Sequence, residues 1–264
     1  MRSKAGAALC LLLFAAACGA PRVTLPSGDG VPFPESAAAY TEATTECGAV
    51  KTLGASMALS GRAGATRLSA RIDAGFAEPD RLRLEGFPRV SFGGKPFFIL
   101  AARGGEATLV LTRSGGVLRG APPAAIIEAL AGVALDPAQL RAAVSGCGLG
   151  TAQPGAGRAF PNGWAAVEAG DTTVFLRQMD GRWRVAAARR GPLTIEYADF
   201  TSGRPSVVRL RTASGQGAIP AEITLRLSQV EIDVPLVDAV FEVEVPPGAQ
   251  PITLDELRKA GPLG

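Results

Sequence analysis

The stretch RLSARIDAGF, residues 67–76, alternates between apolar and polar or small side chains along its length. Successive side chains of a β-strand point to opposite faces, so one face of this stretch would carry Leu68, Ala70, Ile72, Ala74 and Phe76. Such alternation is typical of an antiparallel strand with one face in a core and the other in solvent. We therefore expect a fold built on antiparallel strands.

Similar short runs lie on both sides of this stretch, for example at residues 82–85, 107–112, 173–179 and 206–212. The chain contains 33 Gly and 20 Pro, many of them between these runs, where they are typical of turns. At residues 180–181 an Asp-Gly pair indicates a tight hairpin. The apolar parity changes at Ser228 and Gln229, which predicts a bulge or a turn, and alternation at residues 241–245 predicts a last strand. In total, these alternating runs predict about 10–11 strands.

Short helices are expected to interrupt the strands. Ser36 can cap a helix over residues 36–50, and Pro122, Pro123 and Gly132 can bound a second. Asp136, Pro137 and Gln139 have the spacing of a capping box and predict a third helix, while residues 254–259 predict a short last one. Residues 154–163 are expected to form a loop.

A few short helices can plug a strongly curved sheet, but they cannot cover a flat one. The expected fold class is therefore mainly β (α+β), a curved, unclosed antiparallel β-barrel with a few short plug or lid helices. Space between the helices and the sheet would be apolar and is the candidate site for an acyl chain. The alternative is a fully packed core, because a packed and a hollow core show the same alternation.

Residues 1–20 have the layout of a secretory signal: Arg2 and Lys4 precede an apolar run at residues 7–17. The run is too short for a permanent membrane span, which needs roughly 20 residues. Its end, FAAACG, resembles the lipobox of bacterial lipoproteins, which implies cleavage before Cys18 and acylation of that cysteine. The alternative is an ordinary signal cut near Ala17 or Ala20. By the same resemblance, Gly19, which stands where an inner-membrane retention Asp would lie, implies the outer membrane.

Three segments follow from this interpretation. Residues 1–17 are a lipoprotein signal peptide, residues 18–34 are a lipidated flexible or extended tether rich in Pro, Gly and Ser, and residues 35–264 are one domain. The remaining length of about 247 residues is within the range of one large all-β domain.

The composition argues against several classes of function. The formal charge of +3 falls to about +1 when Arg2 and Lys4 leave, which favours neither nucleic-acid binding nor electrostatic membrane docking. The chain has no histidine, the commonest general base and transition-metal ligand. The acids Asp73, Asp80, Asp171, Asp180 and Glu196 fall mostly in expected turns or on solvent-facing strand positions. We expect no enzyme, no metal site and no cofactor.

Of the four cysteines, Cys10 is removed with the signal and Cys18 is acylated, so Cys47 and Cys147 are the two that remain as free thiols or as a pair. An even pair in an oxidising compartment predicts a disulfide, and a loop of about 100 residues would stabilise the fold by roughly 4 kcal/mol at best. The alternative is two separately buried thiols. Cys47 shares a helix face with Tyr40, Ala43 and Val50, so it should point inward.

The order of these elements is similar to that of the LolA/LolB superfamily, on its lipidated side. The stretches that carry the resemblance are LSGR (59–62), RLSARIDAGF (67–76), PDRLRLEG (79–86), VSGC (144–147), IEYADF (195–200), LRLSQVEID (225–233) and FEVEVPPGA (241–249). The resemblance implies an unclosed barrel with a helical lid that holds the acyl chains of lipoproteins.

The resemblance also implies an exposed apolar loop that contacts the membrane, here residues 86–96. Its candidate residues are Phe87, Val90 and Phe92, none of which is the leucine usual in the family. The alternative is that these side chains fold back into the core.

The functional expectation is a monomeric, lipid-anchored protein on the periplasmic face of the outer membrane. It would bind lipid or lipoprotein acyl chains in an apolar half-barrel cavity and aid lipoprotein localisation, with a periplasmic carrier protein as a further partner. The alternative is a non-catalytic structural or interaction lipoprotein of an envelope complex with a filled core.

Overall fold

The computed structural model describes residues 23–89, 94–214 and 220–261. In these residues the strands are β1 (Val31–Pro32), β2 (Thr52–Ala63), β3 (Thr66–Ala77), β4 (Arg81–Pro88), β5 (Phe98–Arg103), β6 (Glu106–Leu111), β7 (Gly116–Ala121), β8 (Pro154–Phe160), β9 (Trp164–Ala169), β10 (Thr172–Met179), β11 (Arg182–Arg190), β12 (Leu193–Thr201), β13 (Arg204–Thr212), β14 (Ala221–Ile232) and β15 (Gln250–Pro251). The helices are α1 (Ser36–Gly48), α2 (Pro123–Ala131), α3 (Pro137–Ser145) and α4 (Leu254–Ala260), with a 3₁₀ turn, η1 (Asp238–Phe241).

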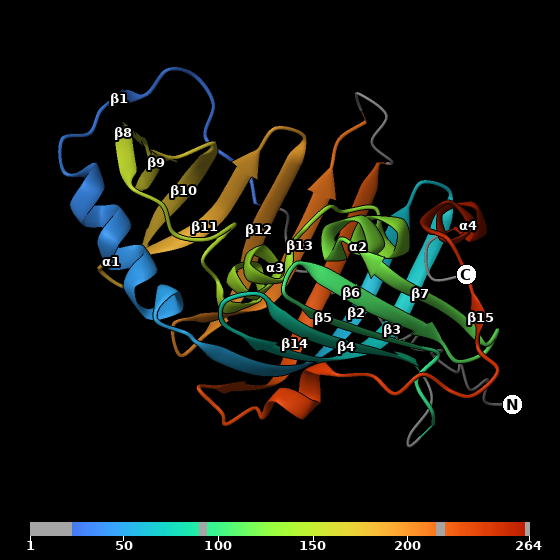
Figure 1. The fold of residues 1–264 in the computed structure, drawn as a ribbon. Helices are drawn as coiled ribbons and strands as arrows, with labels where there is room; N and C mark the ends of the chain where they lie inside the picture. The colour runs from blue at the N-terminus through green and yellow to red at the C-terminus, as the bar shows by residue number, and fades with distance from the viewer. Residues whose placement is uncertain (1–22, 90–93, 215–219, 262–264) are drawn as a thin grey trace, which may run out of the picture.

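All the described strands belong to one curved sheet, in the order β1-β8-β9-β10-β11-β12-β13-β14-β2-β3-β4-β5-β6-β7-β15 (Figure 1). Neighbouring strands are antiparallel except β15 and β7, which are parallel. The short strands β1 and β15 form the two edges, so the sheet does not close on itself. The predicted fold class, an unclosed and mainly β structure with few helices, is confirmed; the sheet has 15 strands in the described residues instead of about 10–11.

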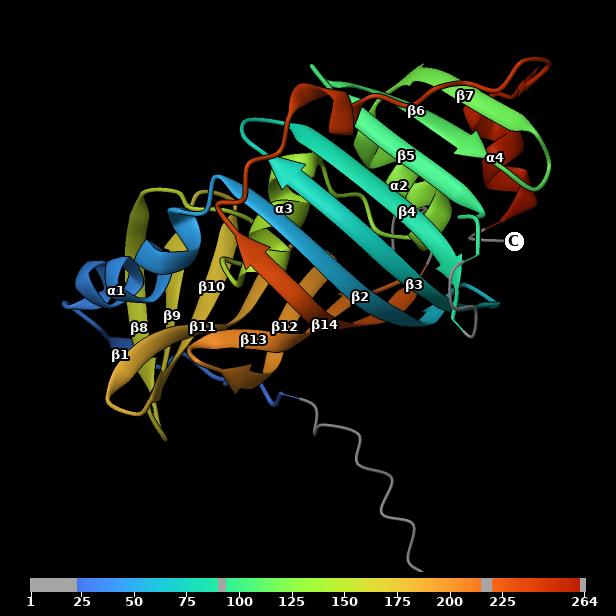
Figure 2. The ribbon, with the colours of Figure 1, turned by 90° about the horizontal axis from the view of Figure 1, so that it is seen from below.

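Helices α2 and α3 lie inside the curve of the sheet, as Figures 1 and 2 show from two directions. Alternate side chains of β2 and β3 point toward them and are buried, including all five apolar residues of the stretch at 67–76. The helix ends follow the predicted signals. Asp136 and Gln139 form a capping box at α3, and Gly132 and Gly146 end α2 and α3 with positive φ angles. Local sequence therefore sets where the plug helices begin and end.

Two segments differ from the sequence-based expectation. Residues 154–160, predicted as a loop, form β8, which pairs with β9 and β1. Gly157 in this strand lies against Ser36 of α1, and a Cβ at Gly157 would come within 2.0 Å of the Cβ of Ser36. The absence of a side chain at Gly157 thus allows close packing between β8 and α1.

The predicted last strand at residues 241–245 is absent from the structure. Phe241 instead ends η1 and is buried, with the guanidinium of Arg81 over its ring. Residues 242–245 alternate between exposed and half-buried positions without pairing to a described strand. The alternation of apolar and acidic residues at 241–245 thus comes from a segment that lies against the outside of the sheet without pairing to it. The predicted irregularity near Ser228 and Gln229 is confirmed as a register shift between β14 and β2.

Residues 23–34, predicted as a flexible or extended tether, are extended and packed on the sheet. Val31 and Pro32 pair with β8, and the ring of Phe33 lies 5.7 Å from that of Trp183. The role of this segment as a spacer above a membrane stays a prediction.

Candidate functional site

An apolar cavity of about 70 Å³ lies between the inner face of the sheet and the plug helices. Every side chain that lines it is apolar: Met57, Leu59, Ile72, Leu84, Phe98, Ile127, Leu130, Ala131, Val133, Leu140, Leu210, Ile223 and Leu225. The strand residues among them occupy alternate positions of β2, β3, β4, β5, β13 and β14. A cavity with this lining suits a hydrocarbon, because it offers no hydrogen bond to a polar group.

The size of this cavity limits what it can hold in the conformation described. Sites for small molecules commonly enclose about 300–1,000 Å³, several times more than is open here. A long acyl chain could enter only if side chains repacked or a helix moved outward. The flexible side chain of Met57 and the leucines of the wall can repack more readily than β-branched residues.

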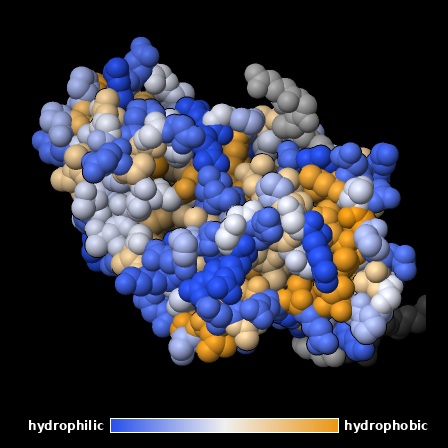
Figure 3. Space-filling view, viewed as in Figure 1, coloured by the Kyte–Doolittle hydropathy of each residue, from blue (hydrophilic) through white to orange (hydrophobic). Residues whose placement is uncertain are grey.

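A second small cavity of about 100 Å³ continues from the first toward α4. Phe98 and Leu130 line both cavities, and Leu257 of α4 lines only the second. Figure 3 shows apolar residues gathered on the surface around α2, α4 and β7, at this end of the molecule. Helix α4 therefore covers the end of the apolar interior.

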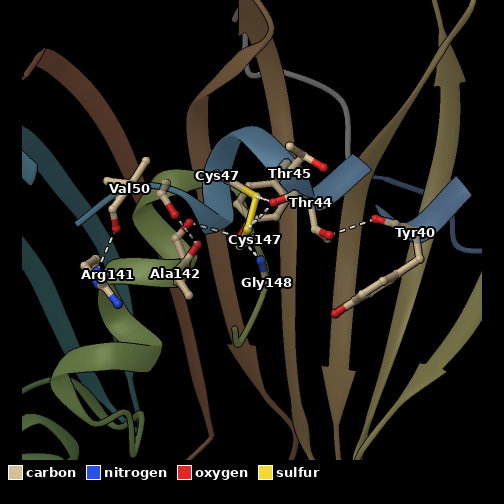
Figure 4. The surroundings of a disulfide bond; sticks show 12 residues. Tyr40, Thr44, Thr45, Cys47, Val50, Arg141, Ala142, Cys147 and Gly148 are labelled. Atoms are coloured by element: carbon tan, nitrogen blue, oxygen red, sulfur yellow. Dashed lines mark hydrogen bonds between the residues drawn. A yellow bond between two sulfur atoms is a disulfide. The ribbon is translucent and has the colours of Figure 1, made fainter. Parts of the chain in front are cut away.

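Polar contacts tie α3 to the segments that precede β2 and follow β3. Arg141 of α3 donates a hydrogen bond to the carbonyl of Val50 at 2.7 Å and forms an ion pair with Glu78 at 3.0 Å. The structure also contains a disulfide between Cys47, at the end of α1, and Cys147, just after α3, with their Cα atoms 5.5 Å apart (Figure 4).

Helix α2 has much weaker polar contacts. Among the described residues its one ion pair joins Glu128 to Arg258 of α4 at 4.0 Å, between partly exposed side chains. Exposed ion pairs of this kind contribute little, about 0–1 kcal/mol. Polar contacts therefore hold α3 more firmly than α2, which is held mainly by its buried side chains Ile126, Ile127 and Leu130.

Tyr197 of β12 is a buried anchor for the end of α3, a role that was not predicted from the sequence. Its hydroxyl accepts a hydrogen bond from the backbone N–H of Gly148 at 2.8 Å and donates one to the carbonyl of Ala143 at 3.0 Å. Burial raises the pKa of the Tyr197 hydroxyl far above its usual value near 10, although the hydrogen bond from Gly148 acts in the opposite direction.

We predict that Tyr197→Phe lowers the free energy of unfolding by about 1–3 kcal/mol, because it leaves a buried N–H and a buried carbonyl without their partner. The native state keeps Tyr197 protonated, whereas the unfolded chain loses this proton above a pH of about 10. Stability of the unmodified protein should therefore fall above that pH more steeply than that of the variant. Urea unfolding at pH 7 and at pH 10.5 measures both effects; equal stabilities at pH 7 would contradict the assigned role.

The structure locates only part of the predicted site. Cys18, Val90 and Phe92 lie outside the described residues. Phe87 lies in β4, only 7% exposed, on the outer face of the sheet, with the guanidinium carbon of Arg71 4.4 Å from its ring centre. In this position Phe87 is covered by Arg71 on the outer face and belongs to neither of the two apolar clusters. Its contact with a membrane stays a prediction.

The acidic residues weighed as catalytic candidates are dispersed over the sheet. Asp73 accepts a hydrogen bond from Ser56, Asp171 lies 3.9 Å from Arg190, and Glu196, only 4% exposed, lies 2.8 Å from Arg211. Across residues 23–89, 94–214 and 220–261, no three Asp, Glu, His or Cys side chains are grouped so as to hold a metal ion.

None of the helices in the described part of the chain combines the length and the apolar character that a membrane span requires.

Among known proteins, similarity to this chain was found only at the level of solved structures. No protein-family model and no curated protein matches the sequence. Solved structures similar to this chain include a LolA superfamily protein from Nitrosomonas europaea, at 12% identity and a TM-score of 0.49, covering 78% of this chain and 94% of that chain. They also include a DUF1329 family protein from Desulfovibrio piger, at 11% identity and a TM-score of 0.45, covering 80% and 98%.

A third similar structure is the lipoprotein LppX from Mycobacterium tuberculosis, at 12% identity and a TM-score of 0.33, covering 77% of this chain and 98% of that chain. These scores are all below 0.5. The fold class therefore rests on the strand order and curvature of the sheet, and the functional argument rests on the cavity.

Proposed function

We propose that this protein is a lipid-anchored protein of the bacterial envelope that binds an acyl chain between the curved sheet and helices α2 and α3. The observation that carries the proposal is the cavity described above, whose lining side chains are all apolar. Transfer of an acyl chain between two apolar sites needs no catalyst, because a difference in affinity is enough to drive it. The ligand class is the acyl chain of a lipid or of a lipoprotein.

The proposed binding step is coupled to movement of α2. The cavity is small while α2 is in place, and α2 is the plug helix with the weaker polar contacts. Outward movement of α2 would join the two cavities that share Phe98 and Leu130 and would lengthen the apolar space toward α4. The disulfide and Arg141 would keep α3 in position during this movement.

The proposed anchor is Cys18, acylated after cleavage of residues 1–17. The sequence around it supports this, since small residues end the apolar run and Gly19 follows the cysteine. Gly19 favours the periplasmic face of the outer membrane, where the protein would accept acyl chains from a periplasmic carrier.

The small size of the cavity favours a second candidate function. If the interior stays as full as it is here, the protein is a structural or interaction lipoprotein whose core takes no ligand. Binding of a fluorescent fatty acid to the protein, with its disulfide intact, distinguishes the two. Saturable binding supports the carrier, and a folded protein that binds no probe supports the interaction protein.

We predict that Ala131→Leu lowers the affinity for a fluorescent fatty acid by about tenfold, which corresponds to roughly 1.4 kcal/mol. Ala131 lines the cavity from the end of α2, so the larger side chain would occupy space that the ligand needs. The matched control is Ala134→Leu, since Ala134 is exposed three residues later, in the connection to α3. Fluorescence titration measures both affinities. Equal affinities for the two variants would place the probe elsewhere.

A further inference from the structure

A second apolar cluster lies on the outer face of the sheet, on the opposite side from the cavity. Its buried members are Trp164, Ala166, Phe175, Ala186 and Ala187, from β9, β10 and β11. The strand register places Ala166 opposite Phe175, and Phe175 opposite Ala187, so these side chains share one face. Val23 and Leu25 lie over this cluster. The first described residues of the chain therefore run along this outer face.

A groove of about 770 Å³ opens beside this segment, and its size is within the range of sites for small molecules. Its apolar walls include Leu25, Phe160, Trp164, Met179 and Phe200. The sheet itself widens here, because β11 and β12 pair only over residues 187–190 and 193–196 and then separate. Large amphipathic rings such as that of Trp164, next to a long flexible side chain such as that of Met179, are suited to the boundary between water and lipid.

Three arginines, Arg158, Arg177 and Arg189, surround the cluster on the same outer face. All three are exposed, and none forms an ion pair with a described residue. The guanidinium carbon of Arg177 lies 5.4 Å from the ring centre of Trp164, and that of Arg189 lies 5.4 Å from the ring centre of Phe175. In Arg177 and Arg189 the guanidinium group itself lies over an aromatic ring while the side chain stays exposed, so its positive charge remains available to a lipid headgroup.

Nearby carboxylates leave this positive charge largely uncompensated. Asp199, at the far end of the groove, lies 3.8 Å from Arg226, and Glu196 is paired with Arg211. Glu168 accepts hydrogen bonds from the hydroxyl of Thr173 and is an acid that the strand register places on this face. The small net charge of the chain argued against electrostatic docking, but the charges are distributed unevenly, and this face is locally basic.

The position of Cys18 limits where a membrane can lie. Four residues lie between it and Val23, and the five steps from Cys18 to Val23 span at most about 18 Å in a fully extended chain, about 3.6 Å per step. An acylated Cys18 would thus hold the bilayer close to the outer face of β8–β11.

We infer that this outer face of β8–β11 is the surface that meets the bilayer. Arg158, Arg177 and Arg189 contact phospholipid phosphates, and the groove beside Trp164 receives an acyl chain from the bilayer. The inference rests on the proposed acylation of Cys18. It orients the molecule: the cavity and α2 lie on the other face of the sheet, away from the membrane surface, where a soluble carrier can reach them.

The two tryptophans of the chain make a direct test possible, because they lie on opposite faces. Trp164 belongs to the outer cluster, whereas Trp183 packs against the main core and Phe33. The acylated protein, beginning at Cys18, would be placed in anionic phospholipid vesicles with or without brominated acyl chains, which quench tryptophan fluorescence only at close range. Trp183→Phe leaves Trp164 as the reporter, and Trp164→Phe is the matched control with Trp183 alone. Circular dichroism verifies that both variants are folded.

Brominated lipid is expected to remove about half of the emission of Trp164 and little of that of Trp183. In the Trp183→Phe variant, whose remaining tryptophan is Trp164, replacing Arg158, Arg177 and Arg189 by Gln should reduce this quenching. Two results would overturn the inference and leave the anchor in place: equal quenching of the two tryptophans, or no quenching of either in protein that floats with the vesicles. The groove would then be considered as a site for a partner peptide. Protein that does not float overturns both the anchor and the inference. Fatty-acid titration of Ala131→Leu and Ala134→Leu without vesicles tests the cavity separately, because Ala131 lines the cavity and not the groove.

Discussion

Replacement of both Cys47 and Cys147 by alanine is expected to lower the free energy of unfolding by about 2–4 kcal/mol. The disulfide joins residues 100 positions apart, so it removes a large loop-closure entropy from the unfolded chain. Alanine is chosen because Cys147 is buried, and a serine there would add a hydroxyl to an apolar environment. Urea unfolding followed by circular dichroism at neutral pH measures the change.

Two comparisons make this experiment specific. Unmodified protein unfolded in the presence of a thiol reductant should lose about as much stability as the double variant. The double variant itself should not respond to the reductant. Unchanged stability in the double variant would mean that the bond does not form or does not stabilise the protein. Its loss should also loosen α3 relative to α1, because Cys147 follows the end of α3 directly.

Replacement of Cys18 by serine is expected to abolish both acylation and membrane attachment. Stable attachment needs at least two acyl chains, because one chain gives only marginal and reversible binding. In the proposed arrangement all of these chains are carried by Cys18, so the effect should be close to complete. Cells grown with an alkyne-labelled fatty acid, followed by membrane flotation, measure acylation and attachment together.

The matched control for this experiment is Cys10→Ser. Cys10 lies within the apolar run at residues 7–17, which the proposed cleavage removes. This variant should retain both the label and membrane attachment. Label remaining in Cys18→Ser would assign acylation to another residue, and absence of label from the unmodified protein would support an ordinary secretory signal.

The sequence predicted those parts of the fold that depend on local chemistry. Alternation identified the inward faces of β2 and β3, and short-range hydrogen bonding identified the cap of α3 at Asp136 and Gln139. Prediction from the sequence failed where a segment's structure depends on contacts with residues that are distant in the chain. Residues 154–160 form a strand because β9 and β1 provide backbone partners and because α1 packs on Gly157.

The candidate site was predictable in composition but not in shape. Inward positions such as Leu59, Ile72 and Leu225 follow from alternation, yet the same pattern describes a full and a hollow interior. Tyr197 falls at an inward strand position, and nothing in its surroundings in the sequence indicates its bonds to Gly148 and Ala143. The outer cluster required the structure, because Trp164 and Phe175 lie on the face that alternation assigns to solvent.

The pairing of β14 with β2 has a consequence for secretion. An exported chain crosses the membrane from its N-terminus, so β2 emerges long before the partner with which it forms one of the longest ladders in the sheet. Until residues 221–232 arrive, one edge of β2 has no native partner and is open to pairing with other chains. With the proposed signal at residues 1–17, the protein is thus expected to complete its sheet only near the end of translocation and to depend on periplasmic chaperones until then.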